Sequence, residues 1–187
     1  MRRALHLLGI LDDLDIEWIA TNGEVERVRA GEVLIQASSP VHSMYILLDG
    51  QLSVYVEKPV RLQIARLMPG EIVGEISFVS SRLPSASVAA IQDSHLLTLQ
   101  RDQLLVKLAK EPAFGARFYR AIASFLADRL HVTTSRFGYG SAAQDGDPDE
   151  IDEAQMEDIS LATIRFDKLL RNLRKDYKIK AIKPLAS

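Results

Sequence analysis

The sequence lacks cysteine altogether, has a single tryptophan and contains no long apolar run. Without cysteine, disulfide bonds, thiolate catalysis and thiolate metal ligands are excluded. No stretch approaches the roughly 18 consecutive apolar residues that a membrane-spanning helix needs, so we predict no transmembrane segment. The net charge is only −2, which gives no overall attraction to nucleic acid or to an anionic membrane. The cytoplasm is therefore the expected compartment.

Length and composition are those of an ordinary globular chain. The 187 residues are 47% apolar and 26% charged, which supports one main core and argues against two full domains. Residues 1–11 are basic and then apolar, but His6 and Gly9 interrupt them and two aspartates follow without a small-residue cleavage pattern. We therefore interpret this segment as an amphipathic helix and not as a signal peptide.

After a short helix, the chain alternates with period two from Glu24 to Leu99. Asp12, Asp13 or Asp15 can cap a short helix over residues 16–20, which Asn22-Gly23 ends. Strands are predicted over residues 24–29, 32–36, 43–48, 51–56, 61–67, 71–73, 87–91 and 95–99. Asp49-Gly50 between the third and fourth strands is a strong hairpin signal. Short strands at this spacing predict a mainly β fold, an antiparallel jelly-roll β-barrel with flanking helices.

Helical periodicity returns at Arg101. Asp102 can cap a helix over residues 103–108, and Pro112 opens a longer one that runs to about residue 137. The apolar face of the longer helix contains Phe114, Phe118, Ala121, Phe125, Leu126 and Leu130. This face is broad enough to cover the barrel and to meet a second copy, so we expect a homodimer through residues 112–137, with Phe118, Phe125 and Leu126 at the interface.

After residue 138 the chain is first acidic and then basic. Residues 145–158 contain eight acidic side chains and no basic one, which predicts a flexible acidic linker over residues 139–160. Residues 161–187 form a basic tail that permits an amphipathic helix. We expect this tail to contact the linker only loosely and to bind an unidentified protein partner through residues 159–187, while a membrane surface or phosphates stay open as alternatives.

The apolar residues of that tail need burial somewhere. They are Ile164, Phe166, Leu169, Leu170 and Leu173. We therefore predict that the chain has three parts, namely a domain over residues 1–138, the linker over residues 139–160 and the tail over residues 161–187.

Residues 74–87, which we call the cassette, interrupt the strand pattern. Gly74 permits close approach of a ligand to the backbone, and a carboxylate follows at once in Glu75. A run of small and hydroxyl residues then offers amides that can hold an anion, with Arg82 nearby. A buried glutamate suits a pair of ribose hydroxyls, whereas amides, a serine and an arginine suit a phosphate. A serine-rich surface loop gives the same pattern, so the residues alone leave both interpretations open.

Four segments give the chain a resemblance to a known family. They are Gly31-Glu32-Val33-Leu34, Tyr45-Ile46-Leu47-Leu48-Asp49-Gly50, Pro69-Gly70-Glu71-Ile72-Val73-Gly74-Glu75-Ile76 and Ala86-Ser87-Val88-Ala89-Ala90. With the order of short helix, eight strands, Gly-Glu cassette and two helices, residues 8–137 resemble the cyclic-nucleotide-binding domain of bacterial catabolite activator proteins and protein kinase A regulatory subunits. The resemblance implies a non-catalytic regulatory module with cyclic AMP or cyclic GMP as its ligand.

The resemblance also implies a set of ligand-binding residues. Gly74 and Glu75 match the residues that hold the ribose 2′-hydroxyl, Ser85 matches a hydroxyl residue near the phosphate or purine, and two threonines match hydroxyls that meet the purine from the two subunits. The full implied set is Gly74, Glu75, Ile76, Ser77, Arg82, Ser85, Ala86, Ser87, Val54, Ile64, Thr133 and Thr134. In this set the amides of Ile76, Ser77 and Ala86 face the ligand, and Val54 and Ile64 line the base.

One position departs from the family pattern. The family's phosphate arginine directly precedes the Ser85 position, where this chain has Pro84, and Arg82 is the nearby candidate to replace it. Loss of a bidentate guanidinium removes about 1.5–3 kcal/mol, or roughly 10- to 100-fold in affinity. A second hypothesis therefore stays open, in which the fold has lost its ligand and serves as an interaction adaptor.

Enzymes and DNA-binding regulators fit the sequence less well. Metalloenzymes on similar jelly rolls use clustered ligands, whereas His6, His42, His95 and His131 fall on separate predicted elements, so no metal or other cofactor is predicted. The serines of the cassette have no nearby histidine to act as a base. About fifty residues remain after the long helix, and the first twenty are acidic, so a complete DNA-binding domain is not expected.

Overall fold

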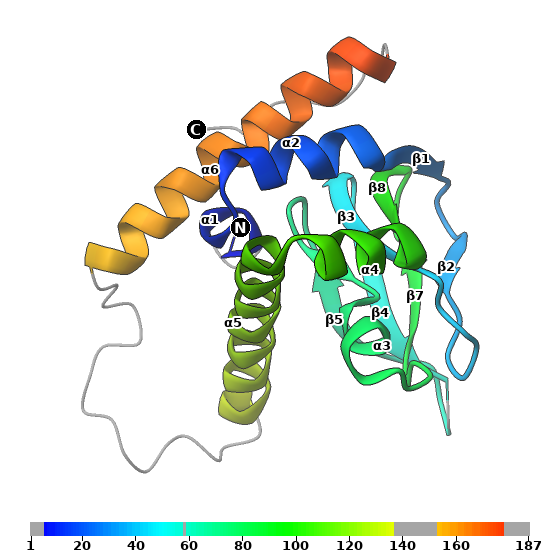
Figure 1. Cartoon of the computed structure of the whole chain (residues 1–187). Coiled ribbons are helices and arrows are strands. Elements are labelled where there is room, and N and C mark those ends of the chain that lie inside the picture. Colours follow the sequence, from blue (N-terminus) through cyan, green and yellow to red (C-terminus); the bar gives the residue numbers. More distant parts are fainter. Residues whose placement is uncertain (1–5, 58, 137–152, 178–187) are drawn as a thin grey trace.

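A computed structural model describes residues 6–57, 59–136 and 153–177 of the chain. The helices are α1 (His6–Ile10), α2 (Asp13–Asn22), α3 (Glu75–Ser80), α4 (Arg101–Lys110), α5 (Pro112–Arg136) and α6 (Glu153–Tyr177). The strands are β1 (Glu24–Val28), β2 (Val33–Ile35), β3 (Ser43–Asp49), β4 (Leu52–Val56), β5 (Leu62–Leu67), β6 (Ile72–Val73), β7 (Ser87–Ala90) and β8 (Ser94–Gln100). The strands gather on one side of the molecule and the long helices on the other (Figure 1).

The eight strands form two antiparallel sheets. Their orders are β1-β8-β3-β6 and β2-β7-β4-β5, so each sheet takes strands from both halves of the barrel sequence. Two facing four-stranded sheets with flanking helices are the jelly-roll architecture, which confirms the predicted fold class.

The predicted hairpin at Asp49-Gly50 is wrong. β3 pairs with β6 and β8, whereas β4 pairs with β5 and β7, so the two strands that flank the turn lie in different sheets. Gly50 has φ +99° and packs against Ser94, whose hydroxyl accepts a hydrogen bond from the Gln51 amide at 3.1 Å. The turn therefore carries the chain from one sheet to the other. A two-residue turn signal specifies the reversal but not which sheet receives the next strand.

The sheet that contains β3 is buried on both faces. Met44 and Ile46 of β3 point toward the helices, and Leu47, the residue after Ile46, points toward the second sheet. Each of these side chains is about 1% exposed. Two hydrophobic clusters result, one between the sheets and one between this sheet and the helices. The helices are consequently part of the core and not attachments to it.

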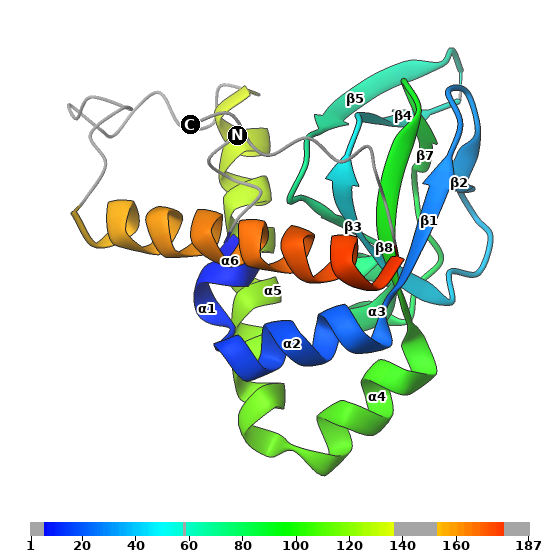
Figure 2. The same cartoon turned by 90° about the horizontal axis from the view of Figure 1, so that it is seen from above.

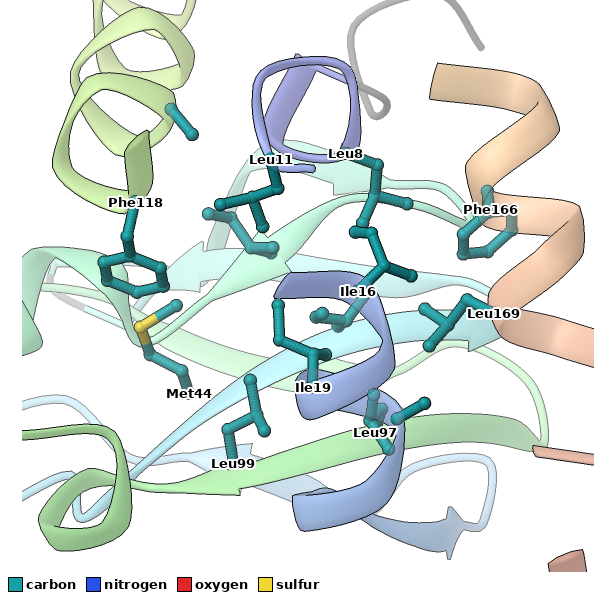
Figure 3. Packing of buried hydrophobic residues seen from close by; sticks show 14 of the residues in the cluster. Leu8, Leu11, Ile16, Ile19, Met44, Leu97, Leu99, Phe118, Phe166 and Leu169 are labelled. Carbon is teal, nitrogen blue, oxygen red and sulfur yellow. The ribbon is translucent and has the colours of Figure 1, made fainter. Parts of the chain in front are cut away.

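Aromatic side chains of α5 fill the helical side of this core. The Phe114 and Phe118 rings stack with centroids 5.6 Å apart, and Phe78 of α3 meets Phe118 edge-on at 5.8 Å. Phe118 and Phe125, which the dimer prediction placed at an interface between subunits, are buried within the single chain; Figure 3 shows Phe118 in this core. That part of the prediction is wrong. The dimer itself stays a prediction, and among the side chains of α5 that the structure describes, the large apolar ones that are exposed are Tyr119 and Leu130.

The helix starts follow local capping rules in most places. Asp12 caps α2: its carboxylate accepts a hydrogen bond from the Asp15 amide, and the Asp15 carboxylate accepts one from the Asp12 amide. α5 begins at Pro112, as predicted. α4 begins one residue before Asp102, so the predicted cap by that side chain is wrong. Asp102 instead lies in the first turn, where a carboxylate suits the positive end of the helix dipole.

The C-terminal helix α6 is packed and not loosely attached. It begins at Glu153, inside the segment predicted to be a linker, and it crosses α1 and α2 (Figure 2). One face of it is buried in the helical core, namely Ala162, Phe166, Leu169, Leu170 and Leu173. The prediction of a loose tail is therefore wrong for this part of the chain. Residues 178–187 of the predicted tail and 139–152 of the predicted linker lie outside the described residues.

Removing one aromatic ring from α6 tests this packing. Phe166 is fully buried beside Leu8 and Ile16, so Phe166→Ala should lower the free energy of unfolding by about 3–5 kcal/mol. Ile164 lies on the same helix but is 57% exposed, and Ile164→Ala should change stability by no more than about 0.5 kcal/mol. Urea denaturation of the two variants gives both values. Equal, small effects would show that α6 is not part of the folded core.

Candidate functional site

The cassette starts where the chain leaves β6 and enters the short helix α3. Gly74 makes the connection with φ +90°, a left-handed conformation that side chains disfavour. A Cβ atom at this position would lie 2.5 Å from the Ser43 carbonyl oxygen of β3. Both constraints require glycine, and together they fix the direction in which α3 leaves the sheet.

Glu75, the first residue of α3, is a buried carboxylate with a charged partner from a distant element. Its side chain is 2% exposed, and Arg129 of α5 donates a hydrogen bond from Nη1 to Oε1 at 2.6 Å. The same guanidinium donates from Nη2 to the Ile72 carbonyl at 3.2 Å and lies over the Phe125 ring, 4.4 Å from its centroid. Arg129 thus joins the long helix to the strand and the helix that border the cassette.

The environment of Glu75 changes its acidity. Burial raises the pKa of Glu75 above its ordinary value, and the positive charge of Arg129 opposes part of that rise. A carboxylate can accept more hydrogen bonds than the one from Arg129. Hydroxyl groups of a ligand suit this site because they donate hydrogen bonds to the carboxylate without adding a second charge.

Arg101 holds the other end of α3. From the first turn of α4 it donates from Nη1 to the Ser77 carbonyl at 3.1 Å and from Nη2 to the Ser81 hydroxyl at 3.2 Å. Its guanidinium also lies 5.5 Å from the centroid of the Phe78 ring. Ser77 itself is buried, whereas Ile76 is exposed. The short helix is therefore tied to α5 at its start and to α4 at its end.

The second half of the cassette lies on the segment that follows β2. The Ser87 hydroxyl is buried and accepts hydrogen bonds from the Ala37 amide at 3.0 Å and from Gln36 Nε2 at 3.4 Å. The Pro84 carbonyl accepts one from the Ser38 amide at 2.8 Å. These bonds give Ser87 a structural role. Ala86 is half-buried.

The remaining predicted residues occupy varied environments. Arg82, Ser85 and Ile64 are exposed, and Val54 is half-buried against the cluster between the sheets. Thr133 and Thr134 are exposed near the end of α5, and their hydroxyls donate to carbonyls of the preceding turn, including that of Arg129 at 2.7 Å.

Sequence reasoning missed both arginines that hold α3. One signal could have found Arg129, because it precedes Thr133 by four residues and the two share a helix face. No comparable signal marks Arg101, since only the tertiary fold brings the start of α4 against α3. The structure therefore adds a positioning frame to the residues that the motifs predicted.

A hollow of about 470 Å³ borders the second half of the cassette. It is lined by β2, by Gln36, by residues 39–42 and by Tyr45 of β3, and none of the predicted ligand-binding residues is among them, although Gln36 donates a hydrogen bond to Ser87. Burial raises the pKa of the Tyr45 phenol, and a hydrogen bond with Ser43 opposes part of the rise. The hollow carries no charged group aimed at its interior, and we keep the cassette as the candidate site.

Two further properties concern only the described parts of the chain. Within residues 6–57, 59–136 and 153–177, no three His, Asp or Glu side chains are grouped so that they could hold a metal ion. No helix in the same ranges is long and apolar enough to cross a membrane.

The two facing sheets and the Gly-Glu step between β6 and α3 define a jelly-roll domain with a short helix inserted between two strands. Residues 25–111 match the family model described as the cyclic nucleotide-binding domain. This match confirms, for that part of the chain, the resemblance that the four sequence segments indicated. In the described residues α5 is followed by the single helix α6 and not by a DNA-binding domain.

Solved structures share this fold. A cyclic nucleotide-binding domain from Methylobacillus flagellatus superposes with a TM-score of 0.66 at 18% identity, over 77% of this chain and 85% of that one. The catabolite activator protein of Thermus thermophilus superposes with a TM-score of 0.61 at 20% identity, over 91% and 87%. At these identities the likeness establishes the fold.

Curated relatives are much longer than the part that matches. Glutaminase 2 of Bradyrhizobium diazoefficiens is 30% identical over 147 residues, and the match covers 76% of this chain but 23% of that protein. An uncharacterized NTE family protein of Mycobacterium tuberculosis is 25% identical over 134 residues, again over 23% of its length. The chain therefore spans about a quarter of these relatives.

The two buried carboxylates should respond to pH in opposite directions. The raised pKa of Glu75 means that its contribution to stability grows as pH falls from neutral toward the unfolded value near 4.3. Burial alone would raise the pKa of Asp15 as well, but hydrogen bonds from Arg117 and from the Asp12 amide lower it. The contribution of Asp15 is therefore present above about pH 3.9 and is lost as pH falls further.

Urea denaturation at a series of pH values tests both signs. The stability of the wild type relative to Glu75→Gln should increase as pH falls toward about 4.3, and relative to Asp15→Asn it should decrease below about pH 4. The prediction concerns the direction in which relative stability changes with pH and not its absolute value, because each substitution also removes an ion pair. A Glu75→Gln curve parallel to that of the wild type would contradict the assigned environment of Glu75.

Proposed function

We propose that the chain is a non-catalytic regulatory module that binds a cyclic nucleotide, cyclic AMP or cyclic GMP, in the cassette. The observation that carries the proposal is the buried Glu75 carboxylate, presented directly after Gly74 and paired with Arg129 of α5. Ribose hydroxyls would donate to this carboxylate. The first-turn amides of α3 have no intrahelical acceptors, so those of Ile76 and Ser77 are suited to the ligand.

The contact between Glu75 and α5 supports a signalling role. A ligand hydroxyl that donates to Glu75 would share the carboxylate with Arg129. Binding of a ligand in the cassette would therefore change the Glu75–Arg129 contact that holds α5. The family also occurs within proteins of unlike activity: matched segments make up 23% of a glutaminase and 26% of a putative potassium channel protein of Rhodopseudomonas palustris. This distribution supports a module whose output lies in other segments or chains.

One observation favours a second function. Pro84 stands at the position of the family's phosphate arginine, and its carbonyl is bonded to the Ser38 amide. Arg82 is exposed two residues earlier, where it could meet a phosphate only from the surface. If Arg82 does not bind a phosphate, the domain would be an adaptor that has lost its ligand and acts through its helices.

Nucleotide titration followed by thermal unfolding separates the two functions. A ligand present at 100 times its dissociation constant stabilises the native state by about 2.7 kcal/mol. We expect this stabilisation with cyclic AMP or cyclic GMP, and none with the matching linear 5′-monophosphate. Absence of any shift up to millimolar cyclic nucleotide would favour the adaptor.

Truncating the carboxylate tests the site itself. Glu75→Ala should weaken binding of the preferred cyclic nucleotide at least tenfold, about 1.4 kcal/mol or more, because the ribose hydroxyls lose their acceptor. Glu17→Ala, which removes an exposed carboxylate on α2, should leave affinity unchanged. Calorimetry measures both, and circular dichroism checks that the variants are folded. Unchanged affinity in folded Glu75→Ala would remove this residue from the site.

A further inference from the structure

Three acidic residues at the start of α2 connect the two long helices. Asp12 and Asp15 face α5, where Arg117 binds both, and Asp13 between them faces α6. This junction lies outside the residues 25–111 that match the family model. It is also unexplained by the ligand site, because Asp12, Asp13 and Asp15 do not contact the cassette.

The contact on the α5 side is geometrically specific. Arg117 donates from Nε and Nη2 to the two carboxylate oxygens of Asp15 at 2.6 and 2.8 Å, and Nη2 also lies 2.9 Å from Asp12 Oδ2. The Asp15 side chain is 3% exposed, whereas that of Arg117 is 34% exposed, so the carboxylate side of this fork is shielded from water and the guanidinium side is partly solvated. A bidentate arginine–carboxylate pair fixes relative orientation as well as distance. The Arg117–Asp15 pair therefore fixes the position of the start of α2 relative to α5.

The contact on the α6 side uses two cations. Lys168 Nζ donates to Asp13 Oδ2 at 2.8 Å, and Arg165 Nε donates to Oδ1 at 3.3 Å. Arg165 also donates from Nη1 to the carbonyls of Leu8 and Gly9, at 3.1 and 2.8 Å. Carbonyls in the last turn of a helix have no intrahelical donor, so Arg165 completes the end of α1 while it binds α2.

Buried apolar contacts and ion pairs both hold α6, but in different ways. Phe166 and Leu169 supply buried apolar contact with α1 and α2 (Figure 3). Ion pairs to the exposed Asp13 contribute little stability each, since solvent screens them. Their effect is to select one position of α6, the one in which Asp13 and the end of α1 are both in reach of Arg165.

The same α5 carries the arginine that enters the cassette. Arg117 and Arg129 are twelve residues apart on one continuous helix, about 18 Å along its axis. One end is tied to Glu75 and the other to the acidic start of α2. A change at Glu75 that shifts α5 would therefore also move the start of α2 through Arg117. The same movement would alter the contact of Asp13 with α6.

We propose that α6 is a latch whose docking on α1 and α2 is coupled to the Glu75–Arg129 contact through α5 and the three aspartates. Loosening that contact loosens α6, and undocking α6 loosens α3 in return, because coupling between two sites is reciprocal. The proposal rests on the proposed function only in taking Glu75 as the group that responds to ligand. The coupling itself exists without ligand and is tested without it.

Hydrogen exchange on the full chain, with no nucleotide present, tests the latch. Arg129→Ala should speed exchange of the amides of residues 162–173 at least fivefold, the lower end of ordinary coupling, while amides of β3 and β8 keep their wild-type rates. Arg165→Ala should speed exchange of the same α6 amides and also of α3 by a similar factor. Arg171→Ala is the matched control, because Arg171 is exposed on α6 and donates within its own helix.

Each outcome bears on the proposal. Faster α6 exchange in Arg165→Ala with wild-type exchange in Arg129→Ala would show a docked helix that is independent of the cassette, which overturns the coupling. Unchanged α6 exchange in Arg165→Ala would overturn the latch. If Arg129→Ala also speeds β3 and β8, Arg129→Lys replaces it, since lysine keeps the charge but loses the fork between Glu75 and Ile72. Failure to bind any cyclic nucleotide would refute the proposed function and leave this test intact.

Discussion

The burial of one sheet on both faces determines the rest of the architecture. β3 and β8 present apolar side chains to the second sheet and to the helices alternately, so neither face can meet water. The barrel alone covers one face. α1, α2, α5 and α6 must cover the other, and this requirement brings α5 across the sheet to where Arg129 reaches Glu75. The candidate site thus depends on the same hydrophobic constraint that holds the helices in place.

The sequence predicted what local physics controls. Eight strands, the aspartate cap of α2 and the Pro112 start of α5 follow from periodicity and capping, and the Gly-Glu step was recognisable as a motif. The crossing at Asp49-Gly50, the docking of α6 and the arginines around α3 depend on contacts between residues far apart in sequence. Acidic and basic blocks suggested a solvated tail, because charge is visible in a sequence whereas the apolar surface that receives Phe166 forms only after folding.

The two halves of the cassette are constrained in different ways. The first half is fixed by the left-handed conformation of Gly74 and by two arginines that reach it from separate helices, so its geometry is set before any ligand arrives. The second half lies on the segment after β2, and Arg82 and Ser85 point to solvent. For the ligand that we propose, this arrangement would hold the ribose hydroxyls in a preorganised half and leave the phosphate to an adaptable one.

The burial of α6 has a consequence for how this domain can be divided. A fragment ended after α5 would uncover the surface of α1 and α2 that α6 covers, where Leu8 and Ile16 are fully buried in the described chain. A contiguous apolar surface of this kind promotes association. Such a shortened version would therefore self-associate through a face that α6 covers in this chain, and an oligomer seen with it would report the missing helix and not the natural assembly.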